Sequence, residues 1–98
     1  MSDMGKNFKE LTAQHQSRKE RRMAKNMDTI NQSGVDYEVH NKGWQLNFFI
    51  VGRVVVSFYP SANKWLYRSG EYELTAEYGD AERFLVWFRN ENIRRLRG

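Results

Sequence analysis

The sequence predicts an α+β fold, in which an antiparallel sheet of three to four strands is flanked by an N-terminal and a C-terminal helix. Residues 6–31 contain neither Pro nor Gly and consist mainly of good helix formers. Residues 35–68 alternate apolar and polar side chains between turn sequences, as half-buried strands do. Residues 80–98 start with a helix N-cap and then repeat apolar residues at helical spacing. A chain of 98 residues is about the size of one domain, so we expect residues 1–98 to form a single one.

The N-terminal helix is predicted to end at Gly34, and its apolar face is discontinuous. Its apolar residues form two patches separated by polar turns: Phe8 and Leu11, then Met23, Met27 and Ile30. A continuous helix of roughly 26 residues would reach about 39 Å, more than the roughly 30 Å width of a compact domain of this length. We therefore expect residues 1–23 to form a basic, partly extended helical arm on a compact body, residues 24–98. The alternative is a helix broken into two pieces.

The middle of the chain carries the strand signals. Four segments alternate in polarity or are rich in β-branched and aromatic residues: 35–40, 44–50, 54–59 and 64–68. In the first of them, Val35, Tyr37 and Val39 are predicted to face the core. Pro60 and Asn63 mark a turn before the fourth strand. Residues 71–79, EYELTAEYG, fit either an edge strand or a loop.

The C-terminal helix is predicted to begin after Asp80, whose carboxylate suits the N-cap position. Its core-facing stripe consists of five apolar residues, with Trp87 and Ile93 on the flanks: Ala81, Phe84, Leu85, Phe88 and Leu96. Three arginines near the end of the chain suit the negative end of the helix dipole: Arg94, Arg95 and Arg97.

Composition argues against several classes of function. The chain has no cysteine, which removes disulfides, thiolate metal sites and cysteine nucleophiles and favours a cytoplasmic location. His15 and His40 stand on different predicted elements without ligand-type spacing, so we expect no metal site. The acidic residues alternate as solvent-facing strand residues do, and the glycines are isolated, so neither a catalytic carboxylate pair nor a phosphate loop is predicted. We expect a protein that is not an enzyme and has no catalytic residues, cofactor or small-molecule substrate.

Membrane association is not expected either. The first residues lack the apolar core of a signal peptide, and the longest nearly uncharged apolar stretch, residues 44–51, is far below the ~20 residues that span a bilayer.

The positive charge is concentrated near the two ends of the chain. Residues 1–33 contain seven Lys or Arg against four Asp or Glu, and residues 80–98 contain five against three. The densest basic run lies on the N-terminal helix: Arg18, Lys19, Arg21, Arg22 and Lys25. Like charges three and four positions apart destabilise a helix unless an anion neutralises them, so the run favours phosphate binding, with the C-terminal arginines assisting. A solvated helix face made for solubility is the alternative interpretation.

Aromatic residues make up 14% of the chain, and their alternation prevents all of them from facing inward. Four are candidates for an exposed, partner-binding set: Trp44, Tyr59, Trp65 and Tyr67. Exposed aromatic rings on a sheet either stack on unpaired bases or fill pockets of a protein partner. The competing interpretation is an aromatic-rich core that compensates for small size.

Residues 58–65, FYPSANKW, resemble the FWPGTGKW-like turn of short, mostly uncharacterised proteins encoded in the early regions of tailed bacteriophages and prophages. Those proteins share a similar order: a basic helix like SRKERRMAKN, a strand like VDYEVHN, a hydrophobic hairpin, the turn and a C-terminal helix. The resemblance covers about residues 17–68, and Ala62 and Asn63 stand where the family turn has Gly-Thr-Gly. It implies a phage setting, in which small basic proteins commonly bind DNA, RNA or the host machinery that handles them.

These observations lead to two functional hypotheses. The first is a small phage-type accessory protein of the host cytoplasm that binds a nucleic acid, or a host complex that handles nucleic acid, through the basic N-terminal helix. The second is an inhibitor that docks on a host protein through exposed sheet aromatics, with the basic helix serving solubility or electrostatic steering.

Overall fold

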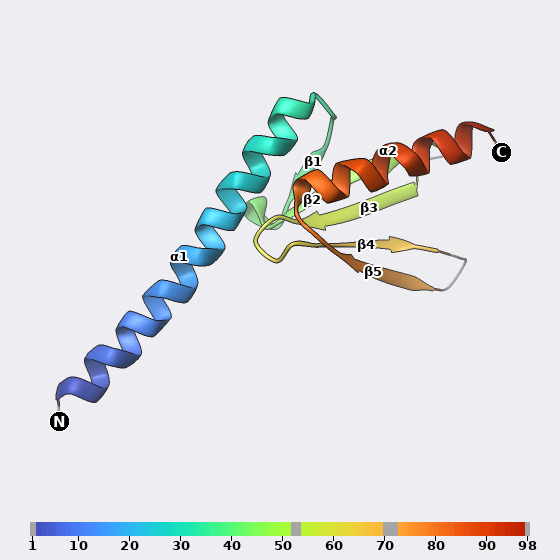
Figure 1. Ribbon diagram of the computed structural model, residues 1–98. Coiled ribbons are helices and arrows are strands. Elements are labelled where there is room, and N and C mark those ends of the chain that lie inside the picture. The colour runs from blue at the N-terminus through green and yellow to red at the C-terminus, as the bar shows by residue number, and fades with distance from the viewer. Residues whose placement is uncertain (1, 52–53, 70–72, 98) are drawn as a thin grey trace.

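The computed structural model describes residues 2–51, 54–69 and 73–97, with side chains from residue 17 onward. The elements follow one another in this order: α1 (Ser2–Ser33), β1 (Glu38–His40), the short 3-10 helix η1 (Asn41–Gly43), β2 (Gln45–Ile50), β3 (Val54–Tyr59), β4 (Lys64–Arg68), β5 (Leu74–Tyr78) and α2 (Ala81–Arg97). Each strand pairs antiparallel with the next, in the order β1-β2-β3-β4-β5. The α+β prediction is therefore confirmed (Figure 1).

The sheet has more strands than the three to four predicted. Residues 74–78 form an edge strand, β5, that pairs with all of β4, so the strand alternative for this region is correct. At the opposite edge β1 is only three residues long, and the prediction that Val39 faces the core is wrong, because that side chain is 59% exposed. Val35 and Tyr37 do pack against the core, from the segment that leads into β1.

The N-terminal helix is continuous over 32 residues, so the broken-helix alternative is wrong. It ends at Gly34, whose φ of 74° lies in the left-handed region that glycine adopts without strain. Its C-terminal part joins the body through the buried residues Asn26 and Ile30. Its N-terminal part projects away from the sheet (Figure 1), and the longest dimension of the molecule is accordingly 64 Å against 32 and 21 Å for the other two.

The core lies between one face of the sheet and the two helices. Its buried side chains come from alternate strand positions and from one stripe of each helix: Ile30, Leu46, Phe48, Ile50, Val56, Phe58, Trp65, Ala81, Phe84, Leu85 and Phe88. Phe84 is fully buried, and its ring lies 4.7 Å from that of Phe48 and 4.8 Å from that of Phe58, measured between centroids. Aromatic packing on this face therefore joins α2 to β2 and β3.

The prediction for the end of α2 needs correction. Leu96 is 72% exposed and Ile93 is 49% exposed, so neither is a core residue. Phe88 is the last buried residue of the helix, and in the turns that follow it polar side chains contact the sheet: Asn92 accepts a hydrogen bond from Val51, and Arg95 lies beside β3 and β4. Helical periodicity identifies a face, but it does not show how far along the helix that face is covered.

Candidate nucleic-acid interface

The five basic residues predicted on the N-terminal helix are all exposed. Arg18, Arg21 and Lys25 are spaced i, i+3 and i+7, which places them on one side of α1. Asn26 and Ile30, the buried residues of the same helix, lie on a different side, and the exposed Lys19, seven positions before Asn26, is in line with them. The basic side of α1 therefore faces solvent rather than the sheet.

Within this run, Arg22 differs from its neighbours because its guanidinium Nη1 donates a hydrogen bond of 3.0 Å to the backbone carbonyl of Ser61. It thus helps to hold α1 against the turn between β3 and β4. Arg18, Lys19 and Arg21 have no acceptor among the side chains from residue 17 onward that the structure describes. The side chain of Lys25 is unpaired within the same set of residues. Four of the five cations are therefore available to an external anion.

One buried amide, which sequence analysis did not identify, fixes the arm to the body. Asn26 is 2% exposed, and its Nδ2 donates to the carbonyl of Pro60 and to Oδ1 of Asn63, both at 2.7 Å. Its Oδ1 accepts a bond of 3.0 Å from the backbone N–H of Ala81, in the first turn of α2. The sequence does contain a signal for this role, since Asn26 interrupts the apolar face formed by Met23, Met27 and Ile30. An Asn buried on such a face requires hydrogen-bond partners.

The turn between β3 and β4 is the docking point for this amide. Pro60 is buried, and Asn63 has a φ of 50°, which Asn tolerates better than most residues. The carbonyl of Asn63 also accepts a hydrogen bond of 2.8 Å from the N–H of Gly79, just before α2. The FYPSANKW and SRKERRMAKN segments therefore contact each other, and both carry structural contacts.

The C-terminal arginines are exposed but lie apart from the basic side of α1. Helix α2 begins beside Asn26, and its 17 residues extend about 25 Å away from that point (Figure 1). Arg94 is bound to Glu91 at 2.7 Å, and this hydrogen bond raises the pKa of the guanidinium. The structure thus does not join the two predicted basic groups into one patch.

Arg95 instead lines a groove of about 720 Å³ that includes two of the predicted aromatics. We call it the sheet groove; its lining residues come from β3, β4, the start of β5 and the end of α2: Val54, Val55, Ser57, Tyr59, Leu66, Tyr67, Arg68, Ser69, Leu74 and Arg95. Residues that were assigned to two separate hypotheses therefore lie around the same depression.

The four predicted binding aromatics differ in exposure. Trp44 is 52% exposed, whereas Tyr59 and Tyr67 are half-buried. The inclusion of Trp65 is wrong: it is 2% exposed, because alternation along β4 points its ring between Phe58 and Phe84 in the core. Tyr67 packs on Trp87, and burial together with a hydrogen bond to Glu77 raises its pKa.

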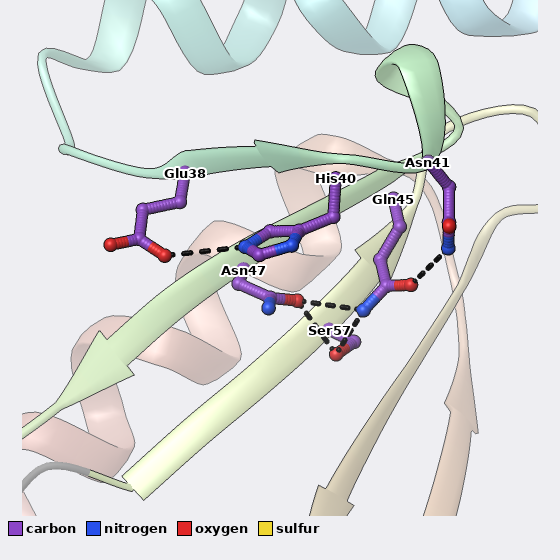
Figure 2. Close-up of polar contacts among 6 residues, drawn as sticks. All are labelled: Glu38, His40, Asn41, Gln45, Asn47 and Ser57. Atoms are coloured by element: carbon purple, nitrogen blue, oxygen red, sulfur yellow. Dashed lines mark hydrogen bonds and ion pairs between the residues drawn. The ribbon is translucent and has the colours of Figure 1, made fainter.

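Next to the sheet groove, the uncovered face carries a polar network that shares Ser57 with the lining of the groove (Figure 2). Gln45 Nε2 donates to Asn47 Oδ1 at 2.9 Å and to Ser57 Oγ at 3.1 Å, and its Oε1 accepts from Asn41 Nδ2 at 2.7 Å. Beside them, His40 Nε2 lies 3.2 Å from a carboxylate oxygen of Glu38. These groups largely satisfy one another, so the network accounts for a hydrophilic patch without requiring a ligand.

The described residues show neither a metal site nor a membrane-spanning helix. No group of three His, Cys, Asp or Glu side chains among them is arranged to hold a metal ion. Neither helix in the described part of the chain combines the length and apolar character needed to cross a membrane. In comparisons with known proteins, the chain matches no family model, no curated protein and no solved structure.

Proposed function

We propose that this protein is a small, non-enzymatic accessory protein that binds a nucleic acid, or a complex that handles nucleic acid, through the basic side of α1. The observation that carries the proposal is the set of four exposed cations without an acceptor among the described side chains: Arg18, Lys19, Arg21 and Lys25. The resemblance of residues 17–68 to phage early-region proteins supports a phage setting and the host cytoplasm as its location.

The position of these charges supports phosphate binding over a purely solubilising role. Arg18 and Lys19 lie before the contacts of α1 with the body, and Arg21 and Lys25 flank those contacts but are exposed, so a phosphate backbone can approach all four from solvent. Mutual repulsion of Arg18, Arg21 and Lys25 at i, i+3 and i+7 spacing costs helix stability, and bound phosphates remove that cost. Arg22 contributes less to phosphate binding, since its guanidinium already donates a hydrogen bond to the carbonyl of Ser61.

The test is a triple charge reversal, Arg18→Glu, Arg21→Glu and Lys25→Glu, which leaves the Arg22 contact in place. Affinity for DNA and RNA oligonucleotides is measured by fluorescence anisotropy over a range of salt concentrations. We expect an unchanged thermal midpoint, a large loss of affinity, and a log–log salt slope shallower by about one unit per contact removed. A matched control reverses three exposed residues of the body instead: Lys42, Arg83 and Arg89. Equal losses in both variants would contradict a role for α1.

A second candidate function, docking on a host protein, is favoured by one observation. The uncovered face of the sheet and its rim expose several large apolar side chains: Trp44, Phe49, Val55 and Leu74. Exposed apolar clusters often mark protein interfaces. A wild-type protein that binds no oligonucleotide at about 50 mM salt, where electrostatic association is strong, would favour this candidate.

A further inference from the structure

We infer that the sheet groove binds a single-stranded nucleic acid, with Tyr59 stacking on an unpaired base at one end of the groove and Arg95 holding a phosphate at the other end. The inference rests on the proposed nucleic-acid binding and specifies its ligand as single-stranded rather than duplex. It concerns a surface formed by β3, β4, β5 and α2, which is separate from the basic side of α1.

The strand register places the floor of the groove on the face of the sheet that the helices leave uncovered. Ser57 pairs with Leu66, and Leu66 pairs with Ala76, so these residues share one face. Neighbouring pairs put Tyr59 opposite Lys64 and Arg68 opposite Leu74 on the same face. The core residue Phe58 points the other way. Two other lining residues, Val54 and Tyr67, point to the covered face, so the groove continues around the end of the sheet to Arg95 of α2. A ligand on this floor would not have to displace either helix.

The lining has the chemistry that recognises a base together with a phosphate. Tyr59 provides a half-buried ring, over which Lys64 Nζ lies 5.5 Å from the centroid, and Val55 and Leu74 provide apolar surface that is 44% and 65% exposed. Planar bases gain stability by stacking on such rings when they are unpaired, whereas a duplex hides its base faces. The volume of about 720 Å³ lies within the ~300–1,000 Å³ typical of small-ligand sites.

Charge complementarity favours an anionic ligand over an apolar peptide. Arg68 and Arg95 are the formally charged side chains among the described lining residues, and both are cations. Glu73, which does not line the groove, is held by Ser69 Oγ at 3.4 Å. Arg95 has no acceptor among the described side chains, unlike Arg94 one position earlier, which is paired with Glu91. An arginine beside a stacking surface is a frequent arrangement for nucleotide recognition.

The experiment measures anisotropy of labelled oligothymidylate and oligouridylate of about 12 nucleotides, and of a duplex of the same length. Tyr59→Leu tests the ring, and Tyr59→Phe is the rescue variant that keeps it. Arg95→Glu tests the cation, and Arg97→Glu is the matched control, because Arg97 is also exposed on the same helix turn but does not line the groove. Circular dichroism melting checks that each variant is folded.

We expect Tyr59→Leu to weaken single-strand binding by roughly 5- to 100-fold, with Tyr59→Phe close to wild type and duplex binding unchanged. Arg95→Glu should weaken single-strand binding more than Arg97→Glu does. The relative affinities for the two labelled single strands then show whether DNA or RNA is preferred.

Outcomes for this groove and for α1 are distinguishable. The inference is overturned if folded Tyr59→Leu and Arg95→Glu proteins bind single strands as the wild type does, even while the α1 triple variant loses binding. If Tyr59→Leu loses binding and the triple variant keeps it, the groove is supported and the role of α1 is wrong. Absence of any oligonucleotide binding by the wild type overturns both and leaves a protein as the partner.

Discussion

The two faces of the sheet are built from the same strands, yet they differ in how their aromatic residues are used. On the covered face, the rings of Phe48, Phe58 and Trp65 pack around Phe84, and all four are at most 2% exposed. On the uncovered face, Phe49 is 46% exposed, and Tyr59 borders a groove. The alternation of β-strands therefore gives the two faces different environments: one face supplies the core, while the other leaves rings exposed to solvent.

The largest effect is expected from a change on the covered face, Phe84→Ala. It removes a fully buried ring that contacts both the sheet and α2 and leaves a cavity, which should cost about 3 to 5 kcal/mol of unfolding free energy. Urea unfolding followed by tryptophan fluorescence measures this loss. A midpoint that hardly moves would mean that the core can be rearranged and that the contrast between the faces is weaker than proposed.

The next effect concerns Asn26→Ala, which deletes the amide that joins α1, the β3–β4 turn and α2. Buried carbonyl and N–H groups at Pro60 and Ala81 lose their partners, at a cost of about 2 to 3 kcal/mol. Lys25→Ala, an exposed neighbour on the same helix, is the control and should change stability by less than about 0.5 kcal/mol.

The same variant also sharpens the comparison in a binding assay. Asn26 contacts Pro60, which directly follows Tyr59, but none of its partners lines the sheet groove, so a folded Asn26→Ala protein should retain single-strand affinity. A parallel loss of stability and single-strand binding would indicate that the uncovered face depends on the arm.

Sequence patterns predicted the elements of this fold well, because periodicity reports which side of an element is apolar. The inward set of β2, Leu46, Phe48 and Ile50, and the start of the α2 stripe both follow that rule. The errors at Val39 and Leu96 share a cause: each lies on the apolar side of its element but near an end that no other layer covers. Periodicity carries no information about the extent of the neighbouring layer.

The candidate sites were less predictable, because they depend on contacts between distant segments. The exposure of the basic run followed from composition, but the contact of Arg22 with Ser61 spans 39 positions. The proximity of Arg95 to the sheet residues around Tyr67 depends on how α2 crosses the sheet, which no local pattern specifies. The buried role of Asn26 was equally hidden, since its three partners lie 34 or more positions away.

A smaller effect is expected from Phe49→Ala on the uncovered face. This ring pairs across strands with Val55 and is 46% exposed, so the loss should be about 1 kcal/mol or less. The comparison with Phe84→Ala uses the same chemical change on the two faces of one sheet, measured by the same urea titration. Equal costs would contradict the division between a stabilising and an available face.

The smallest effect at neutral pH is expected from Tyr67→Phe, which tests the edge where the two faces meet. Tyr67 packs on Trp87 and donates a hydrogen bond of 3.1 Å to Glu77, and removal of the hydroxyl should cost about 0.5 kcal/mol.

The same variant predicts a pH dependence. Burial and then Glu77 raise the pKa of the phenol in the folded protein. The unfolded chain therefore loses this proton first, near pH 10, so the contribution is fully present below that pH and is lost as pH rises through the folded pKa. Urea unfolding at pH 8 to about 11 should show a steeper fall in stability for the wild type than for Tyr67→Phe. If stability falls equally with pH in both proteins, the Tyr67 hydroxyl is in solvent and does not bond Glu77. Tyr67 would then not link the groove to the covered face.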